Sequence, residues 1–276
     1  MLLISDSLSP VDAGRHVATL ALGLQQNGHR VTVAAARDGG LMEELKAAGI
    51  SVRIAGERLG RRSDLRFSEH VLRVIDESMP NVVHAHMPRS AAVAAQDLDE
   101  SSVLVLSDHG ELTWRIRTTT DLTEAFARAD AVISHSYRSR ERLLAAGVES
   151  TRIQVVHDGV RAPEQPQDIG GAGRGWVLGV VTPLVVQSGV DVFIRAAALL
   201  AAQRDRARFV VVGDGPQRGA LERLAEQLGI RDRVGFLAPR ADLSPVLRRL
   251  SVLCVPERTD VTPPAALDLS LIHISE

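Results

Sequence analysis

Two glycine-containing turns have residue types and spacing that could bind the phosphates of a ligand. Gly213 and Gly215 follow the strand predicted over residues 208–212, and Gly14 directly precedes a helix predicted over residues 15–26. A glycine at a helix N-terminus lets an anion approach free backbone N–H groups, which favour a phosphate. The alternative for each is a tight strand-to-helix turn that binds nothing, because an isolated glycine pair is a weak signal.

Histidine and cysteine offer fewer candidates for chemistry. His84 and His86 are two residues apart in a predicted strand and therefore share one face of it. Metal binding would need further ligands, and the sequence spacing identifies none. Cys254 lies in the apolar run 252–255, which indicates a buried core thiol rather than a nucleophile. A single cysteine also excludes a disulfide framework.

Short apolar runs alternate with segments of helical periodicity along the chain, which predicts an α/β fold of doubly wound parallel sheets. The predicted strands cover residues 2–5, 30–35, 50–54, 82–85, 103–106, 131–134, 153–156, 176–181, 208–212, 233–237 and 252–255. The predicted helices cover residues 15–26, 41–48, 67–78, 89–98, 122–128, 137–146, 188–202, 216–228 and 243–249, and another begins near 264.

Pro216 suits a first helical turn, where no N–H partner is needed. Open sheets of this kind bind ligands at the carboxyl ends of their strands, where both glycine turns fall.

The segment 160–175 interrupts this alternation with prolines and a glycine cluster, which indicates a linker. We therefore predict a Rossmann-like N-terminal domain over residues 1–160, a linker over 161–175 and a second Rossmann-like domain over 176–268. Two such domains predict a ligand in the cleft between them.

Composition excludes several classes of protein. The chain has 276 residues, 45% of them hydrophobic and 24% charged, which suits globular domains with ample core. A formal net charge of −2 argues against a general nucleic-acid binder. No apolar run is long enough to span a membrane, and the first residues lack the pattern of a signal peptide, so a cytoplasmic location is expected.

The last eight residues, LSLIHISE over 269–276, depart from the pattern before them. The helix that begins near 264 is expected to stop at Asp268. The string resembles the translation of a sequencing adaptor, so we expect a non-native tail and an incomplete second domain. The alternative is a genuine C-terminus of unusual composition.

Short motifs follow one another in a definite order along the chain. In the first half these are DAGRH at 12–16, GHRVTV at 28–33, VVHAHMP at 82–88, DHG at 108–110, ADAVISHS at 129–136 and VVHDGV at 155–160. In the second half these are SGVDVFIRAAALL, VVVGDGP, DRVGFLA and VLCVPERTD, in that order. The series resembles the family 4 glycosyltransferases of the GT-B fold, and the resemblance extends to Asp268. His157 and Asp158 stand where that family usually has Pro and Asn.

The resemblance implies an enzyme that transfers a hexose-type sugar from a nucleotide-diphosphate sugar to an acceptor hydroxyl, with retention of the anomeric configuration. Electrostatic stabilisation of the leaving diphosphate should dominate catalysis. No metal or other cofactor is expected, because a helix N-terminus and cationic side chains would supply that stabilisation.

The resemblance also assigns roles to residues. His109 would contact the donor sugar near the reacting centre, and Gly14 would face the diphosphate. Asp260 and Asp268 fall on the two acidic positions of the E-x7-E motif of the family. Asp260 would hold sugar hydroxyls and Asp268 ribose hydroxyls, because a carboxylate can accept two hydrogen bonds from a diol.

By the same resemblance, the glycine turn of the second half, Gly213 and Gly215, is expected to bind the donor. Two cations of the family are missing, because Pro183 and Ser188 replace its usual Arg and Lys. Charged hydrogen bonds contribute roughly 1.5–3 kcal/mol each, so their loss should weaken donor binding. Arg15 and Arg258 are the candidates that could compensate.

The glycine-rich loop that follows the first acidic position of the family is also changed here, to Val-Thr-Pro-Pro at 261–264. Two prolines remove backbone N–H donors that would face a phosphate.

The sequence is also compatible with other functions. The missing cations favour a degenerate family member that binds nucleotide or a partner without turnover. A nicotinamide-dependent dehydrogenase should carry GxGxxG after its first strand, and Asp12-Ala13-Gly14 does not supply it. A sugar-nucleotide epimerase of similar fold has weaker motif support.

The expected partners are a nucleotide sugar and an acceptor that is a sugar, a lipid or another small molecule, without nucleic acid. Family members often act on lipids at the inner membrane face, so peripheral membrane contact is an expectation. No amphipathic basic helix in the sequence indicates it.

Overall fold

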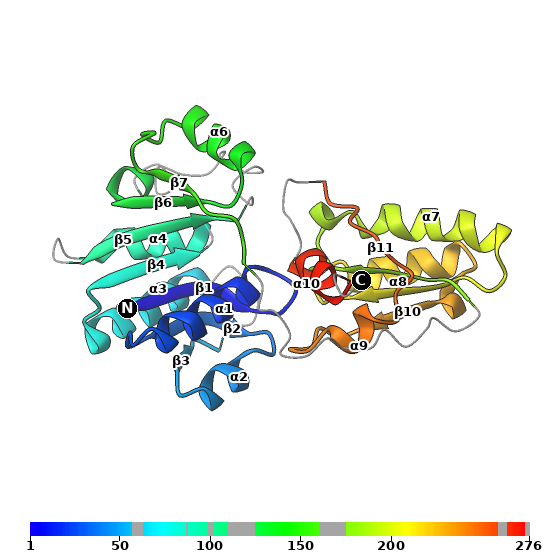
Figure 1. Ribbon diagram of the computed structural model, residues 1–276, viewed down its shortest axis with the longest axis horizontal. Helices are drawn as coiled ribbons and strands as arrows, with labels where there is room; N and C mark the ends of the chain where they lie inside the picture. Colours follow the sequence, from blue (N-terminus) through cyan, green and yellow to red (C-terminus); the bar gives the residue numbers. More distant parts are fainter. Residues whose placement is uncertain are drawn as a thin grey trace. The chain divides into compact units, whose positions relative to one another are not determined.

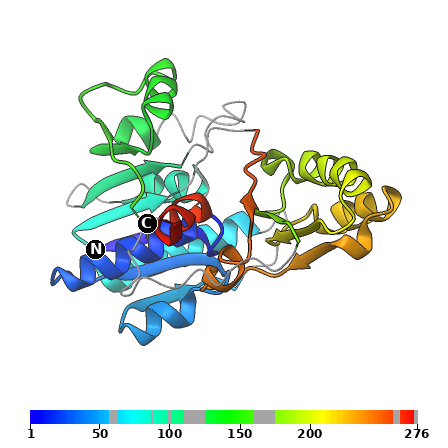
Figure 2. The same cartoon turned by 45° about the vertical axis from the view of Figure 1, so that its right-hand side comes forward.

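The computed structural model describes residues 1–56, 63–86, 88–98, 102–109, 125–159, 175–258 and 264–273. The chain divides into two compact units. The first holds Met1–Ser9 and Ala13–Gly159, and the second holds Pro10–Asp12 and the chain from Val160 onward. Each unit packs helices against a parallel sheet, as Figure 1 and Figure 2 show.

The first unit is built on a seven-stranded sheet of order β3-β2-β1-β4-β5-β6-β7, with every neighbouring pair parallel. Its strands are β1 (Leu2–Leu8), β2 (Thr32–Asp38), β3 (Ser51–Ile54), β4 (Val82–His86), β5 (Val103–Asp108), β6 (Ala131–Ser134) and β7 (Ile153–Val155). The helices described in full are α1 (Ala13–Gln26), α2 (Met42–Ala47), α3 (Ser63–Ser78), α4 (Pro88–Asp97) and α6 (Tyr137–Ala145). The sheet grows in opposite directions from β1 and β4, so the gap between these strands is its topological switch point.

Local sequence explains these elements. In α1, Val17 and Ala21 are buried four residues apart, and the helix ends before Gly28, whose φ of +85° suits glycine. The hydroxyl of Ser136 accepts a hydrogen bond from the backbone N–H of Ser139 and so caps α6. β1 is longer than predicted, because Ser7 and Leu8 continue the pairing with β2 where a loop was expected.

The second unit has a four-stranded parallel sheet of order β10-β9-β8-β11. Its strands are β8 (Val177–Val181), β9 (Arg208–Val212), β10 (Val234–Leu237) and β11 (Val252–Leu253). Its helices are η2 (Val186–Ser188), α7 (Val190–Gln203), α8 (Arg218–Gln227), η3 (Arg231–Arg233), α9 (Ser244–Leu247) and α10 (Pro264–His273). A core under α7 and α8 includes Phe193 and Phe209, whose rings meet edge to face.

Three predictions for the second unit were wrong in detail. α8 begins at Arg218, so Pro216 lies in the preceding turn instead of the first helical turn. α10 continues through His273 instead of stopping at Asp268, and Leu269 packs partly against the core. Cys254 is half-buried rather than fully buried, although this burial still raises the pKa of its thiol. Within the described residues, no helix combines the length and the apolar character needed to cross a membrane.

Candidate functional site

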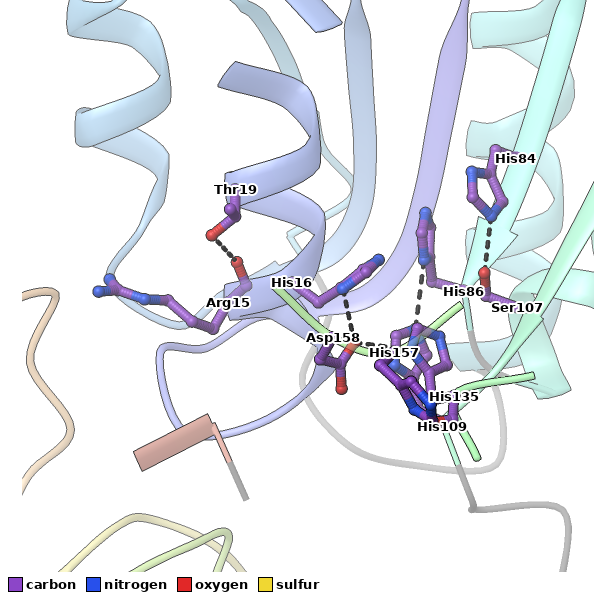
Figure 3. A network of polar contacts seen from close by, with 10 residues as sticks. All are labelled: Arg15, His16, Thr19, His84, His86, Ser107, His109, His135, His157 and Asp158. Carbon is purple, nitrogen blue, oxygen red and sulfur yellow. Dashed lines mark hydrogen bonds and ion pairs between the residues drawn. The ribbon is translucent and has the colours of Figure 1, made fainter. Parts of the chain in front are cut away.

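Imidazole side chains line the carboxyl edge of the seven-stranded sheet. His86 ends β4, His109 follows the end of β5, and His135 follows the end of β6. His16 lies in the first turns of α1, the helix that follows β1. Since β1, β4, β5 and β6 are neighbours in the sheet, these histidines form a row that begins at the switch point (Figure 3).

The rings in this row contact one another. The ring centroid of His16 lies 5.5 Å from that of His86 and 4.9 Å from those of His109 and His135. The rings of His109 and His135 stack at 4.1 Å. His84 lies behind the row, with its ring 4.0 Å from that of His86. The prediction that His84 and His86 share one strand face is therefore confirmed.

Burial keeps the deeper imidazoles neutral. Burial first, and then the neighbouring His84, lowers the pKa of His86 well below its usual value. Burial likewise lowers the pKa of His109, and the nearby His135 lowers it further. Nδ1 of His86 lies 3.3 Å from Nε2 of His109, so these neutral rings share one hydrogen bond.

Asp158, three residues beyond β7, contacts both His16 and His135. Its Oδ1 lies 2.8 Å from Nδ1 of His16 and 2.6 Å from Nδ1 of His135. Burial alone would raise the pKa of this carboxyl group. The contacts with His135 and His16 outweigh burial and lower that pKa, so the group is a carboxylate at neutral pH.

Gly14 is the second residue of α1, the helix that carries His16, and neighbouring backbone occupies the space that a side chain on it would need. A Cβ at this position would lie 2.4 Å from the backbone nitrogen of Ser9 and 2.7 Å from the carbonyl oxygen of Ser7. The loop after β1 therefore occupies the side where a side chain would be. Figure 3 shows the Arg15 side chain directed away from the histidine row.

The glycine turn of the second unit is similarly close-packed. A Cβ on Gly213 would lie 2.0 Å from the carbonyl oxygen of Thr182, and one on Gly215 would lie 2.5 Å from that of Leu184. The backbone N–H of Leu184 donates to the carbonyl oxygen of Asp214. Both glycines are thus required by the loop after β8, independently of any ligand.

The positions that the sequence analysis flagged for missing cations hold a neutral and acidic network. Ser188 is 2% exposed, and its hydroxyl lies 3.1 Å from that of Thr182. The Thr182 hydroxyl donates to Oε1 of Glu257 at 2.5 Å. A hydroxyl has one proton to donate, so the Ser188 hydroxyl donates in turn to Thr182. Burial raises the pKa of the Glu257 carboxyl group.

Arg258 is held by the same loop. Its Nη2 lies 2.9 Å from Oδ2 of Asp191, and its Nη1 donates to the carbonyl oxygen of Val186. Of the two acidic positions, Asp260 lies outside the described residues, and Asp268 lies in α10. The structure therefore brings His109 together with histidines and an aspartate that the sequence analysis did not select.

His16, His135 and Asp158 are the residues of this site that sequence reasoning missed. A usable signal was present, because His135 and Asp158 each follow a predicted strand and His16 begins the helix after the first one. Carboxyl ends of neighbouring parallel strands meet at one edge, so residues at these positions converge.

Comparison with known families decides the identity of the chain. The family model described as Glycosyltransferase Family 4 matches residues 13–162, which is more than half of the chain. The chain belongs to glycosyltransferase family 4. A second model, described as Glycosyl transferases group 1, matches residues 176–270 of this family 4 chain.

Two curated relatives of this family 4 member are the 2-deoxystreptamine glucosyltransferase of Streptomyces kanamyceticus and the D-inositol 3-phosphate glycosyltransferase of Mycolicibacterium smegmatis. The first is 29% identical over 52% of this chain and 38% of its own length. The second is 28% identical over 62% of this chain and 39% of its own length. The chain thus spans roughly two fifths of these relatives.

Solved structures support the GT-B fold. HepE of Anabaena, solved in complex with UDP-glucose, is 22% identical, with a TM-score of 0.72 over 91% of this chain and 72% of that one. WaaG, a glycosyltransferase involved in lipopolysaccharide biosynthesis, is 19% identical, with a TM-score of 0.71 over 98% of this chain and 78% of that one. At these identities the likeness establishes the fold alone.

Proposed function

We propose that this protein transfers a hexose from a nucleotide-diphosphate sugar to an acceptor hydroxyl with retention of the anomeric configuration. The family match over both halves of the chain carries this proposal. The curated glucosyltransferase and the HepE complex with UDP-glucose make a uridine nucleotide sugar the first donor to test.

His109 is proposed to contact the donor sugar. Its low pKa keeps the imidazole neutral at pH 7, so it can accept one hydrogen bond and donate another. A neutral ring can orient a sugar hydroxyl without adding a proton to the leaving diphosphate. The first turn of α1, with Gly14, is proposed to face the diphosphate, since helix N-termini favour anions. Asp260 and Asp268 are proposed to hold the sugar and ribose hydroxyls.

A second function is favoured by one observation in the second unit. The carboxyl group of Glu257, a residue that follows β11, lies beside Thr182 in the loop after β8. Ser188 of this loop is buried at a position where the family has a cation. A partly buried acid beside a loop whose own residues 182–189 include no Lys or Arg disfavours a diphosphate. The alternative is a degenerate member that binds nucleotide or a partner without turnover.

Release of UDP from UDP-glucose by the full chain, measured with and without added acceptor sugars, tests the proposal. The enzyme should release UDP, and His109→Ala should reduce this rate by about 10²-fold or more in a protein that still unfolds cooperatively, at a somewhat lower melting temperature because a buried ring is removed. His29→Ala is the matched control, since His29 is exposed and lies outside the row. UDP binding by calorimetry without any release would support the non-catalytic alternative. Absence of both would refute both functions with this nucleotide.

A further inference from the structure

Histidines are unusually concentrated at the carboxyl edge of the first sheet. Five of the nine histidines of the chain are joined by ring contacts, at 16, 84, 86, 109 and 135. They lie in α1, in β4 and directly after β5 and β6, so the fold brings them together and the local sequence does not. The proposed transfer reaction uses one of them, His109, and leaves the others without a role.

Three donor atoms in this cluster converge. One ring nitrogen of His16, one ring nitrogen of His135 and a carboxylate oxygen of Asp158 lie within 4.8 Å of one another. All three residues are partly accessible, whereas His86 is fully buried. Figure 3 shows the His16 ring and the Asp158 carboxylate turned toward each other beside the ring of His135.

A hydrogen-bonded network is the simplest alternative, and it accounts for this geometry incompletely. Among the described residues, Oδ1 of Asp158 and both ring nitrogens of His135 are buried and make no aligned hydrogen bond. The short separations of 2.6 Å and 2.8 Å thus join atoms whose N–H directions miss the oxygen. Buried polar atoms are normally satisfied, so each such exception calls for an explanation.

A shared third point, an ion between the three residues, would explain the poor alignment of these contacts. Ligands of one tetrahedral ion direct their lone pairs at the ion, and therefore not along the line between two ligands. With ion–ligand distances of about 2.0–2.1 Å, two such ligands lie about 3.3 Å apart. Asp158 would have to move away from the two imidazoles by roughly 0.5–0.7 Å to admit an ion of that size.

Charge and chemistry match a divalent ion. Two neutral imidazoles and one carboxylate leave a divalent ion with one net positive charge, and imidazole is the commonest ligand of zinc-type ions. The stacked ring of His109 restricts the orientation of His135, as supporting groups around metal ligands often do. Asp158 stands where the family usually has Asn, so the carboxylate of this set is a departure in this chain.

We propose that His16, His135 and Asp158 bind one divalent transition-metal ion of the zinc type, with a fourth position open to water or another ligand. The site lies at the switch-point edge of the first sheet. It does not depend on the proposed transfer reaction, because these residues can be tested for metal in the absence of donor and acceptor.

Co²⁺ and Zn²⁺ titrations of the metal-stripped full chain test this site. Calorimetry should show one Zn²⁺ per chain, and Co²⁺ should give the intense visible absorption of a tetrahedral complex. Asp158→Asn should weaken Zn²⁺ binding by at least about 100-fold, since it removes a ligand and not only its support. His29→Ala, which removes an exposed histidine elsewhere, should bind as the wild type does.

The Co²⁺ spectrum of the wild type keeps the test decisive even if Asp158→Asn does not fold. A wild type that shows no stoichiometric Zn²⁺ binding, or only the weak spectrum of octahedral Co²⁺, overturns the proposal. An Asp158→Asn protein that folds and binds Zn²⁺ with unchanged affinity also overturns it. A second variant, His135→Asn, is expected to lose binding as Asp158→Asn does, and unchanged affinity in it contradicts the assignment.

Discussion

Nε2 of His84 lies 2.7 Å from Oγ of Ser107, and both side chains are buried on the neighbouring strands β4 and β5. One hydroxyl is thus the hydrogen-bond partner of an imidazole that solvent does not reach. Burial first, and then the nearby His16 and His135, lowers the pKa of His84 to about 3. The folded protein therefore holds this ring neutral over the whole physiological range.

Acid should destabilise the protein through His84. Below about pH 6.5 the unfolded chain gains a proton at this residue while the folded chain does not, so stability falls as the pH falls toward 3. Each pH unit below 6.5 should cost about 1.4 kcal/mol of unfolding free energy at this residue. Urea denaturation of the wild type and His84→Gln at pH 7, 6 and 5 measures this. The variant should lose less unfolding free energy than the wild type as the pH falls. Equal losses in the two proteins would contradict the assignment of the acid destabilisation to His84. His29→Gln serves as the exposed control.

Gly213 is predicted to tolerate no side chain. In Gly213→Ala the new Cβ would lie 2.0 Å from the carbonyl oxygen of Thr182, so the loop after β8 must move. Such overpacking costs about 1–3 kcal/mol, or a fall of a few degrees in melting temperature. Gly219→Ala is the matched control, because Gly219 lies in α8 with no atom nearer than 3.5 Å. It should raise stability by about 0.5–1 kcal/mol. Equal melting temperatures for the two variants would refute the steric argument.

Pro183→Arg should strengthen nucleotide binding if the proposed function is right. The variant restores a cation at the position where the family usually has one. A charged hydrogen bond contributes roughly 1.5–3 kcal/mol, so UDP affinity should rise about 10-fold or more. Calorimetry with UDP measures the change. Val186→Arg adds the same charge at an exposed position of the same loop and should have little effect. A similar gain in both variants would mean that general charge attraction, and not this position, is responsible.

Glu257→Gln should stabilise the protein at pH 7. Burial raises the pKa of the Glu257 carboxyl group, so the folded state disfavours its charge, and the penalty applies above the pKa of the unfolded chain. Gln keeps an oxygen to accept the hydrogen bond of Thr182 without that charge. Melting temperatures at pH 7 and pH 4 should show an advantage of the variant at pH 7 that disappears at pH 4. A variant less stable than the wild type at pH 7 would show that the carboxylate makes a favourable charged contact.

Much of the fold was predictable from sequence because its signals are local. The strands predicted at 131–134 and 208–212 coincide with β6 and β9, since a strand buried between helix layers has a short, largely apolar sequence. Strand and helix ends were less predictable. β1 extends to Leu8 because pairing with β2 continues through polar residues, and α10 extends to His273 through residues that carried no helical signal.

The sequence alone determined the α/β class, the two glycine turns and membership of glycosyltransferase family 4. Each depends on residue types within a few positions of one another or on the order of short motifs. Only the tertiary structure decided that His16, His86, His109, His135 and Asp158 meet, because they are brought together by strand order. It also decided that Gly14, Gly213 and Gly215 are required by neighbouring backbone. Distances between residues remote in the chain depend on how strands pair, and no local pattern encodes that pairing.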